Sequence, residues 1–323
     1  YLFKKLKIEN IFEKFIVKNK IDLILFNSPS EISLMASNLP FVIILFEFQH
    51  RTDNYLPEYT SFHDFNLREL IIDHASKRAF KIIVATKKDL DTVVNLYNAT
   101  TRNIIIQPYV PFLPDIYNNN KNEVDYNKLF SEFNLSKRKF LLYPAQFWPH
   151  KNHKYLIDAY EKLKSIDNNF KIVFSGYDKG NLDYLKKQIN TKNLNEKFII
   201  FDYLTNDQVI SLYLNAKGLV MPTFVGHSTL PLYEAFFFKL PVFFTKNLLD
   251  DKLKNLVYEI DIFKPDHLAL KMHEYDSNLE EANLKVSSAY DYYLNNCSRK
   301  NLFENFDKIF EQYKYLKGRW SEL

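Results

Sequence analysis

The sequence predicts an α/β protein of two domains, each a doubly wound, Rossmann-like parallel sheet with helices on both faces. The chain has 323 residues, which is more than a single compact core usually holds. Short apolar runs alternate with longer segments of helical periodicity, a pattern typical of parallel strands joined by covering helices. The polar stretch from Asp115 to Val124 interrupts this alternation and predicts a linker between the domains.

The first half of the chain contains four strand-like runs and two helical segments. The predicted strands are Leu23 to Phe26, Phe41 to Phe46, Lys81 to Ala85 and Asn103 to Ile106. Phe65 to Ala79 reads as a helix. Leu2 to Lys20 predicts an amphipathic helix with a lysine-rich face. This opening helix either covers the sheet with its lysines in solvent, or lies in the interface of an anionic membrane.

The second half repeats the pattern more completely. The predicted strands are Phe140 to Pro144, Phe170 to Ser175, Phe198 to Phe201, Leu219 to Met221 and Val242 to Thr245. The predicted helices are His153 to Ser165, Asn181 to Gln188, Asn206 to Asn215, Pro231 to Phe238 and, at the end of the chain, Ser287 to Tyr315. We therefore expect an N-terminal domain at residues 1–123, a second domain at 124–290 and a C-terminal helical segment at 291–323.

The composition excludes several classes of protein. With 46% hydrophobic and 25% charged residues it is that of an ordinary globular protein. The net charge is +4, and the sequence contains no arginine-rich run. Nucleic acid is therefore not an expected partner. The single cysteine, Cys297, allows no internal disulfide, and no apolar run has the length of a membrane span. These features favour a cytoplasmic location.

The scarcity of glycine excludes two common nucleotide-binding motifs from the first half of the chain. The chain has only five glycines, and none precedes Gly176. Neither a dinucleotide fingerprint nor a phosphate-binding P-loop can therefore exist in the first half.

The stretch from Gly218 to Thr245 predicts a strand, a loop, a helix and a second strand, in that order. Ser228 and Thr229 are candidate N-caps of the helix that Pro231 opens. The free amides at such a helix start attract phosphate groups. Glu234 follows within the first turn or two, where it either complements the helix dipole or points into the crevice at the strand ends.

Two further polar clusters follow strands of the same predicted sheet. The first is Tyr143-Pro-Ala-Gln-Phe-Trp-Pro-His-Lys-Asn-His153, and the second is Ser175-Gly-Tyr-Asp178. Because parallel strands end at one edge of a sheet, these clusters and the Glu234 loop should meet there. A lysine on such a loop can neutralise a diphosphate, and an acid can bind both hydroxyls of a ribose.

These motifs, in this order, resemble the C-terminal domain of the family-four (group one) retaining glycosyltransferases. The resemblance rests on Pro-Ala-Gln-Phe-Trp-Pro-His-Lys-Asn-His, Phe-Ser-Gly, Met-Pro-Thr, Leu-Pro-Leu-Tyr-Glu-Ala and Leu-Pro-Val, between Phe140 and Val242. In the first half, Glu47-Phe-Gln-His-Arg51, Arg68 and Val84-Ala-Thr86 are similar to the acceptor-side domain. The resemblance implies the two-domain GT-B fold. It also implies an incomplete N-terminal domain, because the first strands and the Gly-rich loop that usually faces the acceptor are not recognisable.

The resemblance also implies roles for individual residues. Lys151 would contact the donor diphosphate, Glu234 the nucleotide ribose, and His50 the donor sugar and the attacking hydroxyl. Arg51 would lie beside His50 on the acceptor side. The whole implied donor-binding set is Gln146, Lys151, Gly176, Gly226, His227, Ser228, Thr229, Leu230 and Glu234.

Two positions depart from the family pattern. Gln146 stands where the family usually has an arginine, and Gly226 where it has a first glutamate, eight positions before Glu234. Backbone amides from Gly226 to Thr229, or the hydroxyls of Ser228 and Thr229, are the expected substitutes. The departures affect the identity of the donor sugar more than the fold.

No metal or other cofactor is expected. His150 and His153 are spaced like a helical metal pair, yet a third ligand is missing, and His153 is better interpreted as packing on Trp148. Asp250 and Asp251 are better interpreted as a solvated turn. Lys151 and a helix N-terminus can absorb the charge that develops on a leaving diphosphate.

The sequence therefore predicts a retaining, metal-independent, hexosyltransferase-like glycosyltransferase of bacterial surface polysaccharide or lipopolysaccharide synthesis. Its partners would be a nucleotide sugar donor and a glycan or lipid-linked saccharide acceptor. Residues 1–20 would allow peripheral contact with the inner face of the membrane. One alternative is a non-catalytic protein of the same fold that binds nucleotide sugars or glycans. A sugar-nucleotide epimerase would need acid and base groups on both sides of a sugar carbon, and no such pair can be assembled from the sequence.

Overall fold

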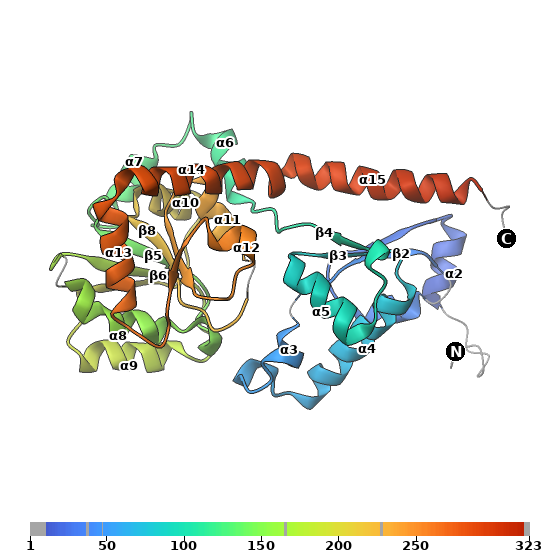
Figure 1. Ribbon diagram of the computed structural model, residues 1–323, viewed down its shortest axis with the longest axis horizontal. Helices are drawn as coiled ribbons and strands as arrows, with labels where there is room; N and C mark the ends of the chain where they lie inside the picture. Colours follow the sequence, from blue (N-terminus) through green and yellow to red (C-terminus); the bar gives the residue numbers. More distant parts are fainter. Residues whose placement is uncertain (1–10, 37–38, 47, 165–166, 227–228, 320–323) are drawn as a thin grey trace. The chain divides into compact units, whose positions relative to one another are not determined.

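The computed structural model describes residues 11–36, 39–46, 48–164, 167–226 and 229–319. The chain divides into two compact units, shown in Figure 1. The first unit comprises Tyr1–Pro108 and Phe303–Leu323, and the second unit comprises Tyr109–Leu302. Each unit contains a parallel β-sheet with helices packed against it, so the predicted fold class is confirmed.

The first unit contains a four-stranded parallel sheet in the order β1-β2-β3-β4. Its strands are β1 (Ile24–Phe26), β2 (Phe41–Ile44), β3 (Lys81–Val84) and β4 (Ile104–Ile106). Its helices are α2 (Ile11–Lys18), α3 (Gln49–Thr52), α4 (Phe62–Arg78), α5 (Lys87–Tyr97) and most of α15 (Arg299–Lys317), with 3-10 turns η1 (Glu31–Met35), η2 (Pro57–Tyr59) and η3 (Thr101–Asn103). The strands coincide with the four apolar runs that predicted them.

Local signals in the sequence fix the ends of the long helices in this unit. The hydroxyl of Ser61 accepts from the amide of Asp64 and starts α4. A reciprocal capping box between Thr86 and Asp89 starts α5. That helix ends at Asn98, whose backbone is left-handed (φ 55°), a conformation that asparagine tolerates better than most residues.

The last helix, α15, packs on the sheet of the first unit. Ile309 is buried against Val42 and Ile83. The hydroxyl of Tyr313 donates to the backbone carbonyl of Asp22 at 2.7 Å. A buried isoleucine and a polar anchor thus hold α15 against this unit.

The second unit contains a six-stranded parallel sheet in the order β10-β9-β8-β5-β6-β7. Its strands are β5 (Phe140–Pro144), β6 (Lys171–Ser175), β7 (Phe198–Phe201), β8 (Gly218–Met221), β9 (Val242–Thr245) and β10 (Tyr258–Ile260). Its helices are α6 (Leu113–Asn120), α7 (Tyr126–Ser131), α8 (His153–Lys164), α9 (Leu182–Thr191), α10 (Asn206–Asn215), α11 (Leu230–Phe237), α12 (Asp251–Lys254), α13 (His267–Ser277) and α14 (Leu279–Asn296), with one 3-10 turn, η4 (Pro149–Lys151).

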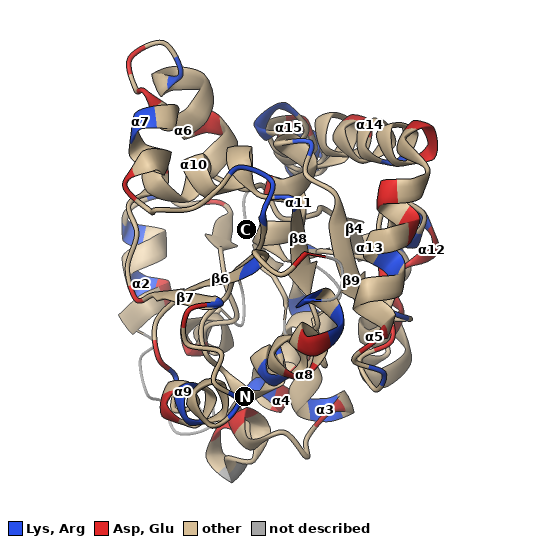
Figure 2. Ribbon diagram, turned by 90° about the vertical axis from the view of Figure 1, so that its left-hand side faces the viewer, with Lys and Arg blue, Asp and Glu red and all other residues tan. Residues whose placement is uncertain are grey.

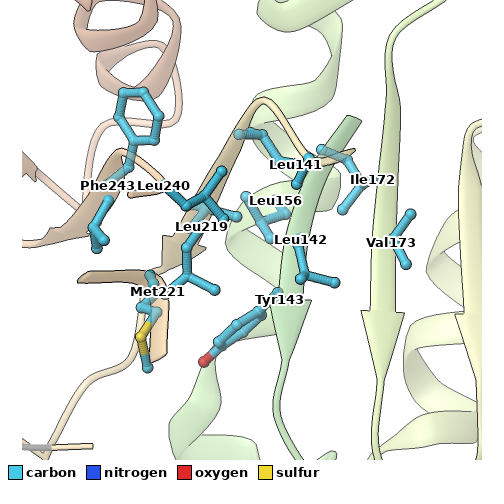
Figure 3. Close-up of a cluster of buried hydrophobic side chains, with 14 of the residues drawn as sticks. Leu141, Leu142, Tyr143, Leu156, Ile172, Val173, Leu219, Met221, Leu240 and Phe243 are labelled. Atoms are coloured by element: carbon cyan, nitrogen blue, oxygen red, sulfur yellow. The ribbon is translucent and has the colours of Figure 1, made fainter. Parts of the chain in front are cut away.

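The core of the second unit is built around its central strands (Figure 3). Leu141 and Leu142 of β5 are fully buried, as expected for a strand that helices cover on both faces. Leu156 of α8 belongs to the same buried cluster and is labelled beside them. Gly218 opens β8 where a Cβ atom would come within 2.8 Å of the Phe243 ring, so the two strands can approach closely only with glycine at this position.

Charged residues lie mainly on helices and loops, whereas the strands are mostly uncharged (Figure 2). Within the part of the chain that the structure describes, no helix combines the length and the apolar character needed to cross a membrane.

The predicted linker and the predicted boundary after residue 123 are wrong. Asp115 to Val124 is largely helical, because α6 covers most of it. Tyr117 on α6 packs against Tyr126, Phe237 and Phe238, so this polar-looking helix has one aromatic face that the second unit covers. The units divide after Pro108 instead.

The predicted division at residues 290/291 also differs from the structure. The C-terminal helical segment is two helices, α14 and α15, which are interrupted at Cys297 and Ser298. α14 packs against α11 in the second unit, and the first unit takes up the chain only from Phe303. Neither the short edge strand β10 nor the helices α5 and α13 had been predicted.

Candidate active site

At the carboxyl edge of the second sheet, the loop after one strand contacts the loops that follow its two neighbouring strands. The three loops follow β5, β6 and β8, and β5 lies between the other two strands. The β5 and β8 loops are joined by a main-chain hydrogen bond, in which the amide of Phe224 donates to the carbonyl of His150 at 2.8 Å. The side chain of Asn152 donates to the carbonyl of Pro222 at 3.0 Å. These bonds fix the backbone on both sides of Lys151.

The β5 and β6 loops touch even more closely. The amide of Phe147 donates to the carbonyl of Tyr177 at 3.0 Å. At Gly176 a Cβ atom would lie 2.4 Å from the carbonyl oxygen of Ala145, a distance that real atoms do not adopt. Gly176 is therefore required for the approach of the two loops, a structural reason that the donor-binding prediction for this residue did not include.

Lys151 ends the 3-10 turn η4, immediately before α8. Asn152 follows it in a left-handed conformation (φ 54°), which turns the chain into the helix. The hydroxyl of Tyr143, a fully buried residue of β5, donates to the carbonyl of Lys151 at 2.8 Å. The backbone that carries this lysine is thus held from the strand below it and from the β8 loop beside it.

Glu234 occupies the second turn of α11 and is 9% exposed. One of its carboxylate oxygens accepts a hydrogen bond from the hydroxyl of Tyr213 at 2.7 Å. Burial raises the pKa of Glu234 to about 7, and the bond from Tyr213 opposes part of that rise. A buried, hydrogen-bonded acid in the second turn is not an exposed partner of the helix dipole, so that simpler interpretation of Glu234 does not hold.

The loop that leads into α11 includes two predicted site residues outside the described part of the chain, His227 and Ser228. Thr229 occupies the N-cap position, as predicted. Its hydroxyl, however, lies 3.7 Å from the sulfur of Met221 and makes no capping bond to the helix. Gly226 has φ 93°, a conformation that a glutamate at this position would adopt only with strain. Leu230, the first residue of α11, is nearly half exposed.

Gln146 lies exposed on the β5 loop, where its Oε1 accepts from the indole nitrogen of Trp148 at 3.1 Å. The ammonium group of Lys179 stands over the Trp148 ring, 5.6 Å from its centroid. Polar and aromatic side chains of two loops therefore cluster where the family usually places an arginine.

The histidine pair beside Lys151 does not form a metal site. His153 is fully buried and packs on Tyr143, Phe147 and Phe174, not on Trp148 as expected. Burial lowers the pKa of His153 to about 3, so the ring stays neutral at physiological pH. His150 stacks on Trp148 instead.

In the described residues, no three His, Cys, Asp or Glu side chains lie close enough together to hold a metal ion. Asp250 caps α12 by accepting from the amides of Lys252 and Leu253, so the Asp250–Asp251 pair begins a helix. The expectation that the protein acts without a metal remains a prediction.

In the first unit His50 and Arg51, on α3, share one partner. Glu69 of α4 accepts from Nε2 of His50 at 3.0 Å and from Nη1 of Arg51 at 2.5 Å. Tyr97 of α5 donates to the same carboxylate at 2.5 Å. His50 is buried, and its ring contacts Phe65 edge-on. Sequence reasoning missed Glu69 and Tyr97, because no local spacing relates them to His50.

The first unit also has a cavity of about 400 Å³ where the chain leaves β1 and β2. Its lining combines apolar side chains with three charged ones. The lining residues are Ser28, Pro29, Glu31, Phe46, Asp64, Leu67, Arg68 and Ile71. Of these, the sequence had singled out only Arg68.

Comparison with known proteins agrees with this architecture. Residues 125–249 match the family model described as glycosyl transferases group 1. No curated protein matches the chain. Similar solved structures include a glycosyltransferase from Rickettsia africae, with a TM-score of 0.72 at 16% identity over 94% of this chain and 79% of that one.

Two other similar structures are HepE of Anabaena in complex with UDP and WaaG, a glycosyltransferase involved in lipopolysaccharide biosynthesis. HepE has a TM-score of 0.71 at 15% identity, over 93% of this chain and 81% of that one. WaaG has a TM-score of 0.63 at 16% identity, over 87% and 76%. At such identities the likeness shows the fold alone. Residues 125–249 thus match the group 1 glycosyl transferase model, and the chain as a whole has the fold of these GT-B glycosyltransferase structures.

Proposed function

We propose that the protein is a retaining glycosyltransferase that moves a sugar from a nucleoside diphosphate sugar to a glycan or lipid-linked acceptor. One observation carries the proposal. Inside the segment that matches the family model, the loop with Lys151 is hydrogen-bonded to the loop that leads into α11. A cation and a helix N-terminus therefore lie on adjoining loops, and together they suit a diphosphate.

Each part of the nucleotide has a proposed partner in the second unit. Lys151 and the first amides of α11 bind the diphosphate, and Glu234 accepts hydrogen bonds from the ribose hydroxyls. HepE, which shares the fold, has been solved with UDP and with UDP-glucose, in support of a nucleotide sugar as donor. Gln146 and the backbone around Gly226 replace the side chains that the family usually directs at the diphosphate and the sugar.

The proposed reaction needs no resident cofactor. The bond between the sugar C1 and the diphosphate oxygen breaks, and a bond from C1 to the acceptor oxygen forms on the same face. The leaving diphosphate takes the proton of the acceptor hydroxyl. Because negative charge builds up on that leaving group, Lys151 and the α11 amides supply the main stabilisation of the transition state.

The first unit supplies the acceptor side in this proposal. His50 and Arg51 are fixed by Glu69, and His50 orients the attacking hydroxyl whose proton the leaving diphosphate takes. The cavity at the ends of β1 and β2 has apolar and charged walls that suit a saccharide. The fold shared with WaaG supports a role in surface polysaccharide synthesis.

The proposal includes a cytoplasmic location with peripheral contact at the inner face of the membrane. On α2, Ile11 and Phe15 are exposed one turn apart, and the lysines at 14 and 18 are exposed beside them. An apolar pair flanked by lysines is the pattern of an interfacial helix. Co-sedimentation with anionic vesicles, compared between the wild type and Phe15→Glu, tests this part separately.

Thermal unfolding with UDP, GDP, ADP and dTDP tests the donor site. A nucleotide at one hundred times its dissociation constant should stabilise the protein by about 2.7 kcal/mol. Lys151→Ala and Glu234→Ala should abolish the effect. Lys154→Ala, at a partly exposed lysine paired with Asp158, should retain it. No stabilisation by any nucleotide would overturn the proposal.

Turnover separates the enzyme from the non-catalytic alternative. A nucleotide sugar with the base identified above is incubated with the protein and a saccharide acceptor, and release of the nucleoside diphosphate is measured. Binding with no release, for every sugar and acceptor tried, would favour a nucleotide-sugar-binding protein that has lost catalysis.

A further inference from the structure

Tyr213 and Glu234 form a buried pair between two helices of the second unit. Tyr213 lies on α10 and Glu234 on α11, and both side chains are almost entirely buried. The phenol donates to Oε2 of Glu234 at 2.7 Å. The Tyr213 ring also stacks on Phe238, with 5.3 Å between the ring centroids. Packing on one side and the carboxylate on the other leave the phenol little freedom.

This contact gives the two carboxylate oxygens of Glu234 different roles. A phenol can donate one hydrogen bond, and Tyr213 donates it to Oε2. The other oxygen, Oε1, has no hydrogen-bond partner among the described residues. A carboxylate with one oxygen anchored by the protein and the other available is suited to accept hydrogen bonds from a diol.

We infer that Tyr213 is a positioning residue, which holds Glu234 so that its Oε1 faces the ribose of a bound nucleotide. The inference rests on the donor site proposed above and extends it to a residue outside the loops that line that site. Tyr213 itself does not touch the nucleotide. It acts through Glu234, and its effect is therefore confined to recognition of the 2′ and 3′ hydroxyls.

The electrostatics of the pair are consistent with this role. Burial disfavours the charged carboxylate, and the phenol hydrogen bond counteracts it. Tyr213 is the ionisable group that shifts the pKa of Glu234. Other packed elements direct their ionisable groups to the aromatic residues of α11: Tyr292 on α14 contacts Tyr233, and Tyr117 on α6 contacts Phe237.

The alternative is that Tyr213 only stabilises the fold. A structural role predicts that removing the hydroxyl weakens all ligands equally or lowers only the melting temperature. A positioning role predicts a selective loss for ligands that carry ribose hydroxyls. A comparison of two ligands that differ only in those hydroxyls separates the two.

The test uses the full chain and the nucleoside diphosphate that stabilises it, together with the 2′,3′-dideoxy form of the same nucleotide. Dissociation constants are measured for the wild type, Tyr213→Phe, Glu234→Gln and Tyr160→Phe. Tyr160 of α8 is the matched control. It is equally buried, and its hydroxyl donates to the backbone carbonyl of Phe170 at 2.8 Å.

We expect the wild type to prefer the ribonucleotide by about tenfold or more, the usual effect of hydrogen bonds to a charged group. Tyr213→Phe should lose most of this preference while keeping its affinity for the dideoxynucleotide, as should Glu234→Gln. Tyr160→Phe should keep both. An unchanged preference in Tyr213→Phe, or an equal loss for both ligands, overturns the inference and leaves the donor site standing. A wild type that binds neither ligand overturns the donor site and this inference together.

Discussion

Nε2 of His50 lies 3.0 Å from Oε1 of Glu69, and this contact joins α3 to α4. α3 has only four residues and no side-chain cap of its own. Glu69 also accepts from Arg51 and from Tyr97 on α5. One carboxylate therefore fixes the position of a helix too short to be stable alone, together with both residues proposed for the acceptor side.

Glu69→Gln should lower turnover while leaving nucleotide affinity unchanged. The amide keeps the size of the side chain but removes the negative charge that His50 and Arg51 face. It should destabilise the protein by about 1–3 kcal/mol, because buried donors lose their charged acceptor. Transfer rate, nucleotide affinity and urea unfolding are the measurements. Asp73→Asn is the control: Asp73 lies one turn further along α4, in an exposed pair with Lys77. Equal turnover in wild type and Glu69→Gln would contradict the role given to this carboxylate.

Gly176→Ala should destabilise the second unit by about 3 kcal/mol, because its Cβ would overlap the backbone of Ala145. Gly180→Ala is the control on the same loop. It has φ 92° but no atom within 4 Å of the added Cβ, so only backbone strain of about 1 kcal/mol applies. Urea unfolding measures both. The explanation by close contact fails if the two variants lose the same stability.

Asn152→Gly and Asn152→Ala separate two contributions to the Lys151 loop. Glycine keeps the left-handed backbone but loses the hydrogen bond to Pro222, which should cost about 1 kcal/mol. Alanine loses the bond and strains the backbone, so its cost should be larger by about 1 kcal/mol. Both variants should weaken nucleotide binding, which titration calorimetry measures.

Asn193→Gly serves as the control for these variants. Asn193 has the same backbone conformation (φ 55°) on the exposed end of α9, away from the three loops. We expect nucleotide affinity equal to that of the wild type. A loss of affinity as large as in Asn152→Gly would mean that general loosening, not the Lys151 loop, is responsible.

Glu234 should make the stability of the protein fall as the pH rises. Its pKa is about 7 when folded, against an ordinary value of 4.5. The folded protein therefore binds a proton that the unfolded chain has released. This contribution is complete below about pH 4.5 and is lost as the pH rises through 7, and it amounts to roughly 3 kcal/mol. Urea unfolding at about pH 5 and about pH 8 should show a smaller decline for Glu234→Gln than for the wild type.

Nucleotide affinity should change with pH in the opposite direction. The carboxylate accepts from the ribose hydroxyls better than the neutral acid does, so affinity should rise through about pH 7 in the wild type. The dideoxynucleotide and the Glu234→Gln variant should show no such rise. The same rise with Glu234→Gln would assign the titration to another group.

The strands of both sheets, apart from the edge strand β10, could be predicted because each is a largely apolar run, which is what burial on both faces requires. Lys151 and Glu234 could be placed at one edge because they follow strands that had been recognised. The linker prediction failed at α6, where three consecutive asparagines conceal an aromatic face that only the packed structure reveals.

The partners of the site residues could not be predicted in the same way. Glu69 lies 19 positions from His50, and Tyr213 lies 21 positions from Glu234. Each pair joins two helices whose rotation about their axes is set by core packing, and no sequence spacing encodes that rotation. The burial of His153 among three aromatic rings was missed for the same reason.

The bond from the Phe224 amide to the His150 carbonyl has an evolutionary consequence, because both of its atoms belong to the main chain. Such a bond survives the replacement of either side chain. Over time, the sequence of the two loops can drift while their spacing stays constant. In the proposed enzyme, this would let substitutions such as those at Gln146 and Gly226 change the preferred sugar without rebuilding the nucleotide site.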